Sequence, residues 1–189
     1  MLEIENVSFS YGLRKSVIKD FSLRLADGER ICLQGASGAG KTTVLRLAMG
    51  LEKPRHGTVT LAPETKISVV FQEDRLLPHK TVGENVALFS DRKTAEDMLC
   101  KLGMGEYAAS LPSVLSGGQK RRVALARALA HPFDLLILDE ALTGLDEENR
   151  AVCLAAIDEA VGNRSLLMAT HDLRDAQALR TEIRGVTEC

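Results

Sequence analysis

The run Gly35–Thr42 holds the densest set of residues whose types and spacing suit chemistry. It reads GASGAGKT and fits the pattern G-x-x-x-x-G-K-[ST] in full. Glycines let a backbone curl until its N–H groups converge on a phosphate, and a helix beginning beside them adds the positive end of its dipole. The pattern places Lys41 on the β- and γ-phosphates and makes the Thr42 hydroxyl a Mg²⁺ ligand. We therefore expect a nucleotide-binding loop formed by Gly35, Ala36, Ser37, Gly38, Ala39, Gly40, Lys41, Thr42 and Thr43.

Two adjacent acids, Asp139 and Glu140, follow the apolar run in DLLILDE. A buried strand that ends in a carboxylate suits the Mg²⁺ shell of a bound nucleotide, so we expect Asp139 to serve the metal and Glu140 to polarise the attacking water. The alternative is that both acids cap a helix beginning near Leu142. The phosphate-binding pattern upstream favours the catalytic interpretation.

His171 follows a second apolar run, Ser165–Thr170. If the strands before Glu140 and His171 are neighbours, both side chains emerge at one edge of the sheet. A histidine there can hydrogen-bond the γ-phosphate and orient the water, although a lone histidine is more often structural or solvated. His56, His79 and His131 lack such surroundings, and we interpret them as surface or loop residues.

The elements that must position these residues follow from hydropathy patterns. Strands of alternating or continuous apolar character alternate with helical segments, which predicts an α/β fold with a mostly parallel sheet and helices on both of its faces. An N-terminal part with two alternating strands precedes the glycine loop, and a polar, helical stretch begins at Asp74. Strands are predicted at residues 2–9, 17–25, 30–34, 58–61, 66–71, 134–139 and 165–170, and helices at 42–51, from Ser116 through Leu129, and at 147–161.

Composition restricts the class of protein. The 189 residues are 45% hydrophobic and 26% charged, as in ordinary globular domains, and the net charge of -2 offers no basic field for nucleic acid. The four cysteines (Cys32, Cys100, Cys153 and Cys189) form no CxxC pair, which argues against a disulfide framework or zinc site and suits a reducing cytosol. No secretory leader and no run near the ~20 apolar residues of a membrane span is present, so a membrane role requires a separate membrane partner.

The sequence LSGGQ at Leu115–Gln119, followed by KRRVALARAL, separates this chain from kinases, small GTPases and helicase-like motors. The chain resembles the ABC ATPases from Leu2 to about Leu179, because a set of their motifs occurs in the family's order: Tyr11 ahead of the phosphate loop, Gln72, LSGGQ, DLLILDE, the loop ending at Asp146, and His171. The resemblance implies a P-loop NTPase core with an N-terminal antiparallel β-subdomain. It also implies that residues 1–189 form a single ABC ATPase domain, with a helical subdomain inserted at about residues 74–130.

The resemblance also implies roles for further residues. Tyr11 would stack on adenine, Gln72 would contact Mg²⁺ or the attacking water, and Asp146 would lie at the seam of a dimer. Residues of the signature would bind the γ-phosphate of an ATP molecule held by the opposite subunit: Ser116, Gly117, Gly118 and Gln119. Three simpler interpretations are that Tyr11 packs on the antiparallel sheet, that Gln72 is a polar strand end, and that the signature is only a helix start.

The segment at Phe71–Val86 reads FQEDRLLPHKTVGENV and resembles the Gln-loop region of importer ATPases, especially those that serve nitrate, sulfonate, taurine and similar solutes. The resemblance implies an ATPase subunit that powers separate transmembrane permease subunits, working as a homodimer or paralogue dimer, with a solute-binding protein in the wider complex. The subunit would be cytoplasmic and peripheral on the inner membrane face. The permease would dock around Arg75–Pro78, unless Leu76 and Leu77 pack inside the helical subdomain.

Two other classes of phosphate-loop protein fit the sequence less well. A soluble ABC ATPase acting in DNA repair or translation would carry long coiled coils or two ATPase units, whereas the segment between Gln72 and Leu115 is short and has no heptads. A phosphate-loop kinase would lack LSGGQ and would need a lid over its acceptor substrate. We expect ATP and Mg²⁺ as ligands and no nucleic-acid partner.

Overall fold

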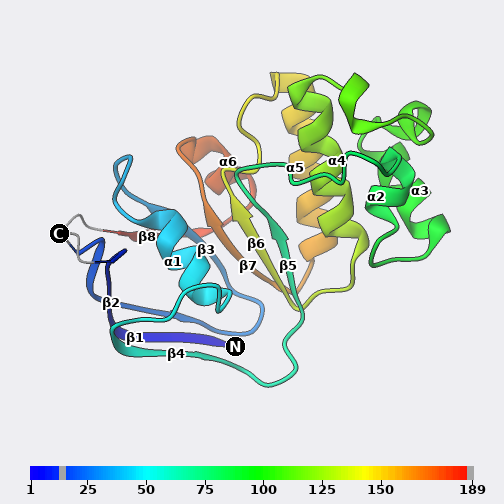
Figure 1. The fold of residues 1–189 in the computed structure, drawn as a ribbon. Coiled ribbons are helices and arrows are strands. Elements are labelled where there is room, and N and C mark those ends of the chain that lie inside the picture. Colours follow the sequence, from blue (N-terminus) through cyan, green and yellow to red (C-terminus); the bar gives the residue numbers. More distant parts are fainter. Residues whose placement is uncertain (13–15, 187–189) are drawn as a thin grey trace. The chain divides into compact units, whose positions relative to one another are not determined.

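The computed structural model describes residues 1–12 and 16–186, and strands and helices alternate along them (Figure 1). The chain divides into two compact units. The first comprises residues 1–67 and 134–139 together with the described part of 163–189, and the second comprises residues 68–133 and 140–162. The predicted 74–130 subdomain lies within the second unit, which also takes in residues 140–162. The description of residues 1–189 as a single domain stays a prediction.

An antiparallel sheet begins the first unit. It consists of β1 (Leu2–Phe9), β2 (Ile18–Leu25) and β4 (His56–Leu61), in the order β2-β1-β4. Leu2 pairs with Leu25 on one side and with Leu61 on the other. The alternation predicted for residues 2–9 appears as buried Leu2 and Ile4 separated by exposed Glu3. The predicted N-terminal antiparallel sheet is therefore confirmed, with a third strand that begins two residues earlier than expected.

A parallel sheet forms the centre of the first unit. The strands β6 (Leu135–Asp139), β7 (Ser165–Ala169), β3 (Arg30–Gln34) and β8 (Glu182–Gly185) are neighbours in that order. All three pairings are parallel. Every residue of β6 and β7 is buried, as the continuous apolar runs predicted. Because the strands are parallel, β3, β6 and β7 bring the segments that follow them to one edge of the sheet.

Two helices belong to the first unit, α1 (Lys41–Ala48) and α6 (Leu173–Ala178). We predicted that the first would extend to Leu51, but it ends at Ala48. Gly50 has a φ of 69°, and its N–H donates to the Leu47 carbonyl while the Leu51 N–H donates to the Arg46 carbonyl. This pair of bonds is a Schellman motif, so the glycine ends the helix.

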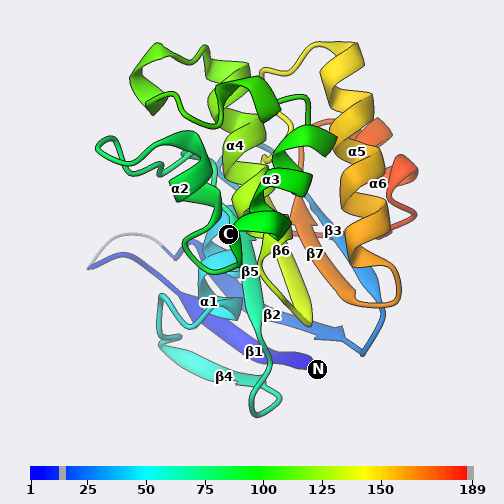
Figure 2. The same ribbon diagram turned by 90° about the vertical axis from the view of Figure 1, so that its right-hand side faces the viewer.

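The second unit holds the remaining elements. The strand β5 (Ile67–Val70) leads into it, and α2 (Val82–Val86), α3 (Arg92–Lys101), α4 (Gly117–Ala130) and α5 (Glu147–Val161) follow. The helices α4 and α5 lie side by side in both views (Figure 2). The stretch predicted to be helical from Asp74 contains two short helices and two 3₁₀ turns before α4. Gly103 and Pro112 lie between α3 and α4, whereas no glycine or proline separates α2 from α3.

Side-chain caps begin the helices of the second unit. Thr81 with Glu84 and Ser116 with Gln119 form capping boxes at α2 and α4, and Asp146 caps α5.

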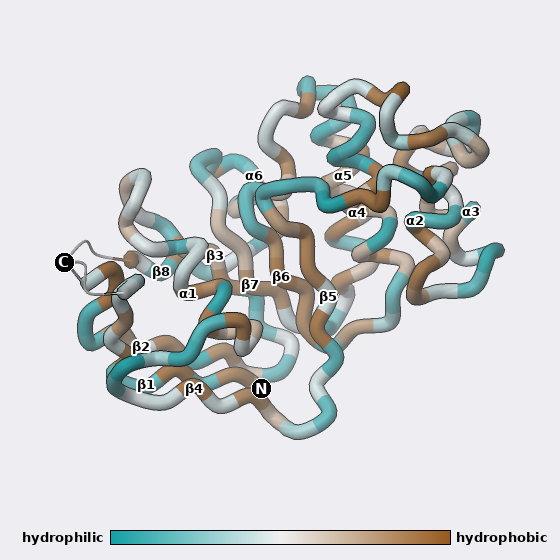
Figure 3. The backbone as a smooth tube through the Cα atoms, viewed as in Figure 1, coloured by the Kyte–Doolittle hydropathy of each residue, from teal (hydrophilic) through white to brown (hydrophobic). Residues whose placement is uncertain are grey.

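Hydrophobic residues are concentrated along the central strands (Figure 3). In the part of the chain that the structure describes, no helix has the length and apolar character needed to cross a membrane.

Candidate functional site

The phosphate loop connects β3 to α1 and is shaped by glycines that cannot be replaced freely. Gly38 and Gly40 have φ angles of 87° and 94°, which an L side chain rarely adopts. A Cβ on Gly40 would lie 2.4 Å from Ile18 Cδ1, and a Cβ on Gly35 would lie 2.6 Å from the Val186 carbonyl oxygen. The loop is therefore tightly packed against its own unit, and its curl depends on glycine.

Lys41 is the first residue of α1 and folds back over this loop. Its Nζ donates to the carbonyl oxygens of Gly35 (2.7 Å) and Ala36 (3.0 Å), and the residue is only 7% exposed. The N-cap of α1 is Gly40, so no side chain caps the first turn. A helix start with bare N–H groups and an adjacent ammonium is suited to an anion.

Thr42 and Asp139 meet although 97 residues separate them in sequence. The Thr42 hydroxyl donates to Asp139 Oδ1 at 3.1 Å, and Asp139 is 4% exposed. Hard oxygen donors of this kind suit Mg²⁺, which binds through a carboxylate or hydroxyl together with substrate phosphates. The structure thus brings two of the three predicted metal residues, Thr42 and Asp139, together at the end of the phosphate loop, whereas Gln72 belongs to the second unit.

Tyr11 lies close to the same loop. Its hydroxyl is 3.5 Å from Thr43 Oγ1, and its ring packs edge-on against Phe9 with centroids 4.8 Å apart. The residue is 39% exposed, which leaves part of the ring accessible. Tyr11 therefore packs on the antiparallel sheet through Phe9, as the simpler interpretation predicted, and the exposed part of its ring lies beside the phosphate loop.

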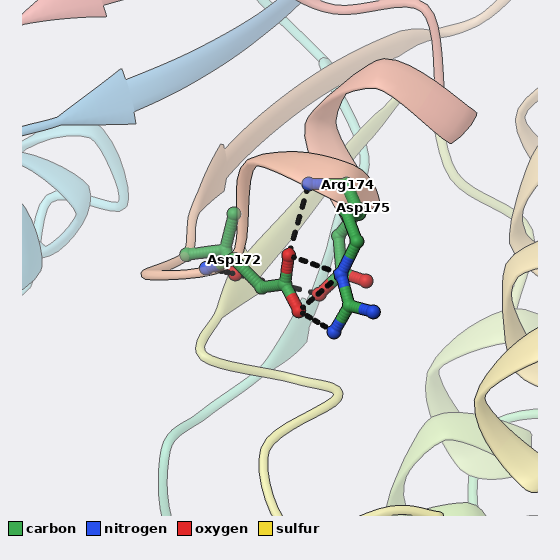
Figure 4. Close-up of polar contacts among 4 residues, drawn as sticks. Asp172, Arg174 and Asp175 are labelled. Carbon is green, nitrogen blue, oxygen red and sulfur yellow. Dashed lines mark hydrogen bonds and ion pairs between the residues drawn. The ribbon is translucent and has the colours of Figure 1, made fainter. Parts of the chain in front are cut away.

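His171 follows β7 and is exposed, and the backbone on both sides of it is held by polar contacts (Figure 4). The Thr170 hydroxyl accepts the Asp172 N–H at 3.1 Å and lies 3.4 Å from Oδ2 of Asp175, a carboxylate only 2% exposed. Asp172 caps α6 by accepting the Arg174 N–H at 2.9 Å, and it also pairs with the Arg174 guanidinium at 2.7 Å. The position of His171 is therefore set by its neighbours.

The signature lies at the start of α4 in the second unit. Ser116 Oγ accepts the Gln119 N–H at 3.3 Å, and Gln119 Oε1 accepts the Ser116 N–H at 2.8 Å. The simpler interpretation, a capped helix start, is thus correct as a description of the local structure. A Cβ on Gly117 would meet nothing within 4 Å, so packing within the chain does not require glycine there. Gly117 is also exposed, so it can be reached from outside the chain.

Glu140 and Asp146 lie on either side of the turn after β6. Glu140 has a φ of 50° and accepts a hydrogen bond from the Thr143 hydroxyl at 3.3 Å. Residues 141–144 form turns, so the predicted alternative, in which the acids cap a helix near Leu142, is wrong. Asp146 accepts the Asn149 N–H at 2.8 Å, and this bond is the main cause that lowers the pKa of Asp146.

Gln72 is exposed and begins the segment that leads to α2. Leu76 and Leu77 are half-buried, so the expected internal packing is present in part, and the docking of a permease around Arg75–Pro78 stays a prediction. Arg75 is exposed, and its guanidinium carbon lies 3.9 Å from the ring centroid of Phe71.

The predicted site residues belong to both compact units. The first unit holds Tyr11, residues 35–43, Asp139 and His171, and the second holds Gln72, residues 116–119, Glu140 and Asp146.

Comparison with known families decides the class of protein. The sequence profile of the ABC transporter family matches residues 18–143. The chain belongs to the ABC transporter family. It is an ATP-binding, ATP-hydrolysing subunit of the ABC type, as predicted, and the alternative of a DNA-repair or translation ATPase is not favoured.

Individual members of the ABC transporter family match along most of the chain. The aliphatic sulfonates import ATP-binding protein SsuB 1 of Rhodococcus jostii is 38% identical, covering 92% of this chain and 74% of its own. The thiamine import ATP-binding protein ThiQ of Haemophilus influenzae is 40% identical over 80% of each chain. The arginine transport ATP-binding protein ArtM of Bacillus subtilis is 36% identical, covering 97% and 86%.

Solved structures agree with the ABC fold. The ATP-binding cassette MJ0796, in a dimeric post-hydrolysis state bound to ADP and Pi, superposes with a TM-score of 0.89 at 28% identity, covering 99% of this chain and 94% of its own. Its description as a bacterial ABC transporter cassette comes from a second dimeric structure, with a TM-score of 0.87. The predicted fold, with a parallel sheet and a small antiparallel sheet, is confirmed.

Sequence reasoning missed several residues of this ABC ATPase that hold its motifs in place. Asn85 is fully buried, and its side-chain amide donates to the carbonyls of Leu77, Lys80 and Thr81, which shapes the segment after Gln72. Arg121 and Arg127 contact that segment as well. Asn85 lies in the importer-like segment Phe71–Val86 and the two arginines lie in the run KRRVALARAL after the signature, but neither pattern assigns these side chains a contact. The signal that could have found them was a charged or amide side chain within an apolar helical stretch.

Proposed function

We propose that this chain binds ATP with Mg²⁺, closes on a second cassette around two ATP molecules, and drives solute import through separate permease subunits. The observation that carries this proposal is the meeting of Thr42 with buried Asp139 beside a glycine loop covered by Lys41. Those three features give a triphosphate a cradle, a cation and a set of metal ligands in one place. The signature at the start of α4 supplies the surface for the second cassette.

The metal would be held by Thr42, Asp139 and Gln72, the last of these assigned only by family resemblance. The half-buried Thr42 hydroxyl and the buried Asp139 carboxylate fit the preference of Mg²⁺ for oxygen donors. When bound, Mg²⁺ neutralises charge on the β- and γ-phosphates. Lys41 exchanges its carbonyl partners in the loop for phosphate oxygens, and the bare N–H groups of α1 bind the same anion.

Hydrolysis in this proposal depends on Glu140 and His171. Glu140 accepts a proton from the water that attacks the γ-phosphate, and His171 holds that water and the phosphate oxygens in line. The contacts around Thr170 and Asp172 keep His171 in position. Tyr11 offers its partly exposed ring to the adenine, beside the loop that binds the phosphates.

The second cassette completes each site. Ser116, Gly117, Gly118 and Gln119 bind the γ-phosphate held by the opposite protomer, and Asp146 lies at the seam. The dimeric structures of MJ0796 support this two-fold arrangement. The second cassette is a copy of this chain or a paralogue. Because each γ-phosphate is bound from both sides, ATP favours the closed state and hydrolysis releases it.

Import is supported by relatives named for sulfonate and thiamine import. Those relatives differ in cargo at similar identity, so the cargo is set by the permease and by a solute-binding protein. The permease docks around Arg75–Pro78, which places this subunit on the inner face of the cell membrane.

The assignment of Glu140 is tested by Glu140→Gln. We expect this variant to bind ATP, to turn over at least about a hundredfold more slowly, and to accumulate as a closed dimer, because the water loses its base while the phosphate contacts remain. Turnover is measured by phosphate release and dimer formation by light scattering with ATP and Mg²⁺. The control Lys41→Ala should lose nucleotide binding and form no dimer. Rapid turnover by Glu140→Gln would contradict the base assignment.

A further inference from the structure

Two arginines of α4 hold the backbone that carries Gln72. The Arg121 guanidinium donates to the carbonyl oxygen of Phe71 at 2.7 Å and to that of Gln72. Arg127 donates to the carbonyl oxygens of Asp74 (3.0 Å) and Arg75 (2.8 Å). Four carbonyls within a five-residue segment are thus bound to one helix, and 49 to 53 residues of sequence separate the partners of each bond.

Burial makes these bonds costly to break. Arg121 is 9% exposed, and Asp74 Oδ1 lies 3.3 Å from its Nε, so the guanidinium is satisfied by backbone oxygens and one carboxylate. Burial lowers the pKa of Arg127, and the charge of Asp74 opposes that shift. A buried guanidinium that loses its acceptors carries a large desolvation penalty. The segment from Phe71 to Arg75 is therefore held firmly against α4.

The same helix begins at the signature. Ser116 caps α4, and Arg121 follows Gln119 by less than one turn, so the two arginines and the signature share one continuous helix. A displacement of the N-terminus of α4 moves the arginines with it, and the arginines in turn move the carbonyls that they bind. The helix thus links the signature mechanically to the backbone of Gln72.

We propose that Arg121 and Arg127 are positioning residues that hold Gln72 in register with the signature helix, so that Gln72 reaches its place in the ATP site only while this clamp is intact. The clamp is defined as the two guanidinium groups and the carbonyls of residues 71, 72, 74 and 75. This inference rests on the role of Gln72 in the proposed function. Neither arginine touches the nucleotide, so both act through Gln72.

A double-mutant cycle on kcat tests the clamp, with the full-length chain, ATP and Mg²⁺. We expect Gln72→Ala and Arg121→Gln each to lower kcat by about tenfold while the KM for ATP changes by less than about twofold. The double variant should lose no more than about twofold beyond Gln72→Ala alone, because once the Gln72 side chain is absent its position no longer matters. Arg121→Lys should restore only part of the rate, since an ammonium cannot span two carbonyls.

Controls separate positioning from general destabilisation. Arg92→Gln removes an exposed arginine of the same unit whose guanidinium pairs only with Glu96 among the contacts described, and kcat should not change. The same double-mutant cycle is measured with Arg127→Gln in place of Arg121→Gln. Because Arg127 is less buried than Arg121, this second variant keeps the test valid if Arg121→Gln does not fold. Additive losses in the cycle would overturn the clamp while leaving the proposed function intact. An unchanged kcat in Gln72→Ala would instead overturn the assigned role of Gln72 and the clamp with it.

Discussion

Single residues of this protein are constrained by contacts that differ in kind. At Gly40 the constraint is steric, because both a positive φ and the nearby Ile18 side chain exclude a Cβ. At Gly117 the chain imposes no such steric limit, because a Cβ there would meet nothing within 4 Å. Asp139 is limited electrostatically: a carboxylate that is 4% exposed needs donors such as the Thr42 hydroxyl.

Cysteine reactivity provides a prediction at this scale. Cys153 is fully buried in α5, and burial raises the pKa of its thiol to about 12, whereas Cys100 is exposed. We expect iodoacetamide at pH 8 to modify Cys100 within minutes and to leave Cys153 unmodified in the folded protein, because the thiolate is the nucleophile. Peptide mass spectrometry measures both sites. Equal labelling rates in native buffer would show that α5 is not packed as described. Cys189 lies outside the described residues.

Elements of the fold are delimited by their capping residues. Ser116, Asp146 and Thr81 begin helices with side-chain acceptors, and Gly50 ends α1 with a left-handed turn. These local devices explain why the predicted start of α4 and both ends of α5 agree with the structure. The region before α4 was less predictable, because short helices such as α2 derive their stability from packing rather than from their own sequence.

The cap of α5 makes the stability of the protein depend on pH. The pKa of Asp146 is lowered in the fold, so its contribution is fully present above its ordinary pKa of 3.8 and is lost as pH falls through the lower folded value. Asp146→Ala should therefore be less stable than wild type at pH 7, with a difference that shrinks as the pH is lowered below about 4.

Urea unfolding followed by circular dichroism between pH 3 and 7 measures this difference. Asp97→Ala is the matched control, because Asp97 is an exposed aspartate in the interior of α3 that caps no helix. A difference between wild type and Asp146→Ala that stayed constant down to pH 3 would show that the charge of the cap contributes nothing.

At the scale of the whole molecule, the proposed site belongs to two chains. The phosphate loop and the signature lie in different compact units, and the signature residues show no packing need for their glycines. In the proposed function, two-fold pairing of cassettes would give each ATP a loop from one protomer and a signature from the other. One protomer would then contribute half of each of two sites.

Mixing two inactive variants tests this arrangement. Lys41→Ala removes the loop lysine and Gly117→Asp blocks the signature, and each variant alone should be inactive. In a mixed pair, ATP bound by the loop of the Gly117→Asp protomer meets the intact signature of the Lys41→Ala protomer, so the pair closes around one intact site although Lys41→Ala alone forms no dimer. An equal mixture should therefore recover up to about a quarter of the wild-type rate, because at most about half of random pairings are mixed. Phosphate release measures the recovery. The control mixes the Lys41→Ala variant with a double variant that carries both Lys41→Ala and Gly117→Asp, and it should recover no activity. If the first mixture also recovered no activity, a site shared between two protomers would be excluded.

The sequence alone determined the features that depend on neighbouring residues. The phosphate loop, the buried strands β6 and β7, the capped start of α4 and the bounds of α5 follow from residue types within a few positions of one another. The relatives then confirmed the ABC class that the ordered motifs had indicated.

Only the tertiary structure decided what joins distant segments. The strand β8 has no buried residue and was missed, since its place depends on pairing with β3 rather than on its own hydropathy. The strand order β6-β7-β3-β8, the contact of Thr42 with Asp139 and the clamp of Arg121 on Phe71 all join residues far apart in the chain. Local periodicity reports which face of an element is buried. It does not report which other element covers that face, because that choice is made by packing of the whole chain.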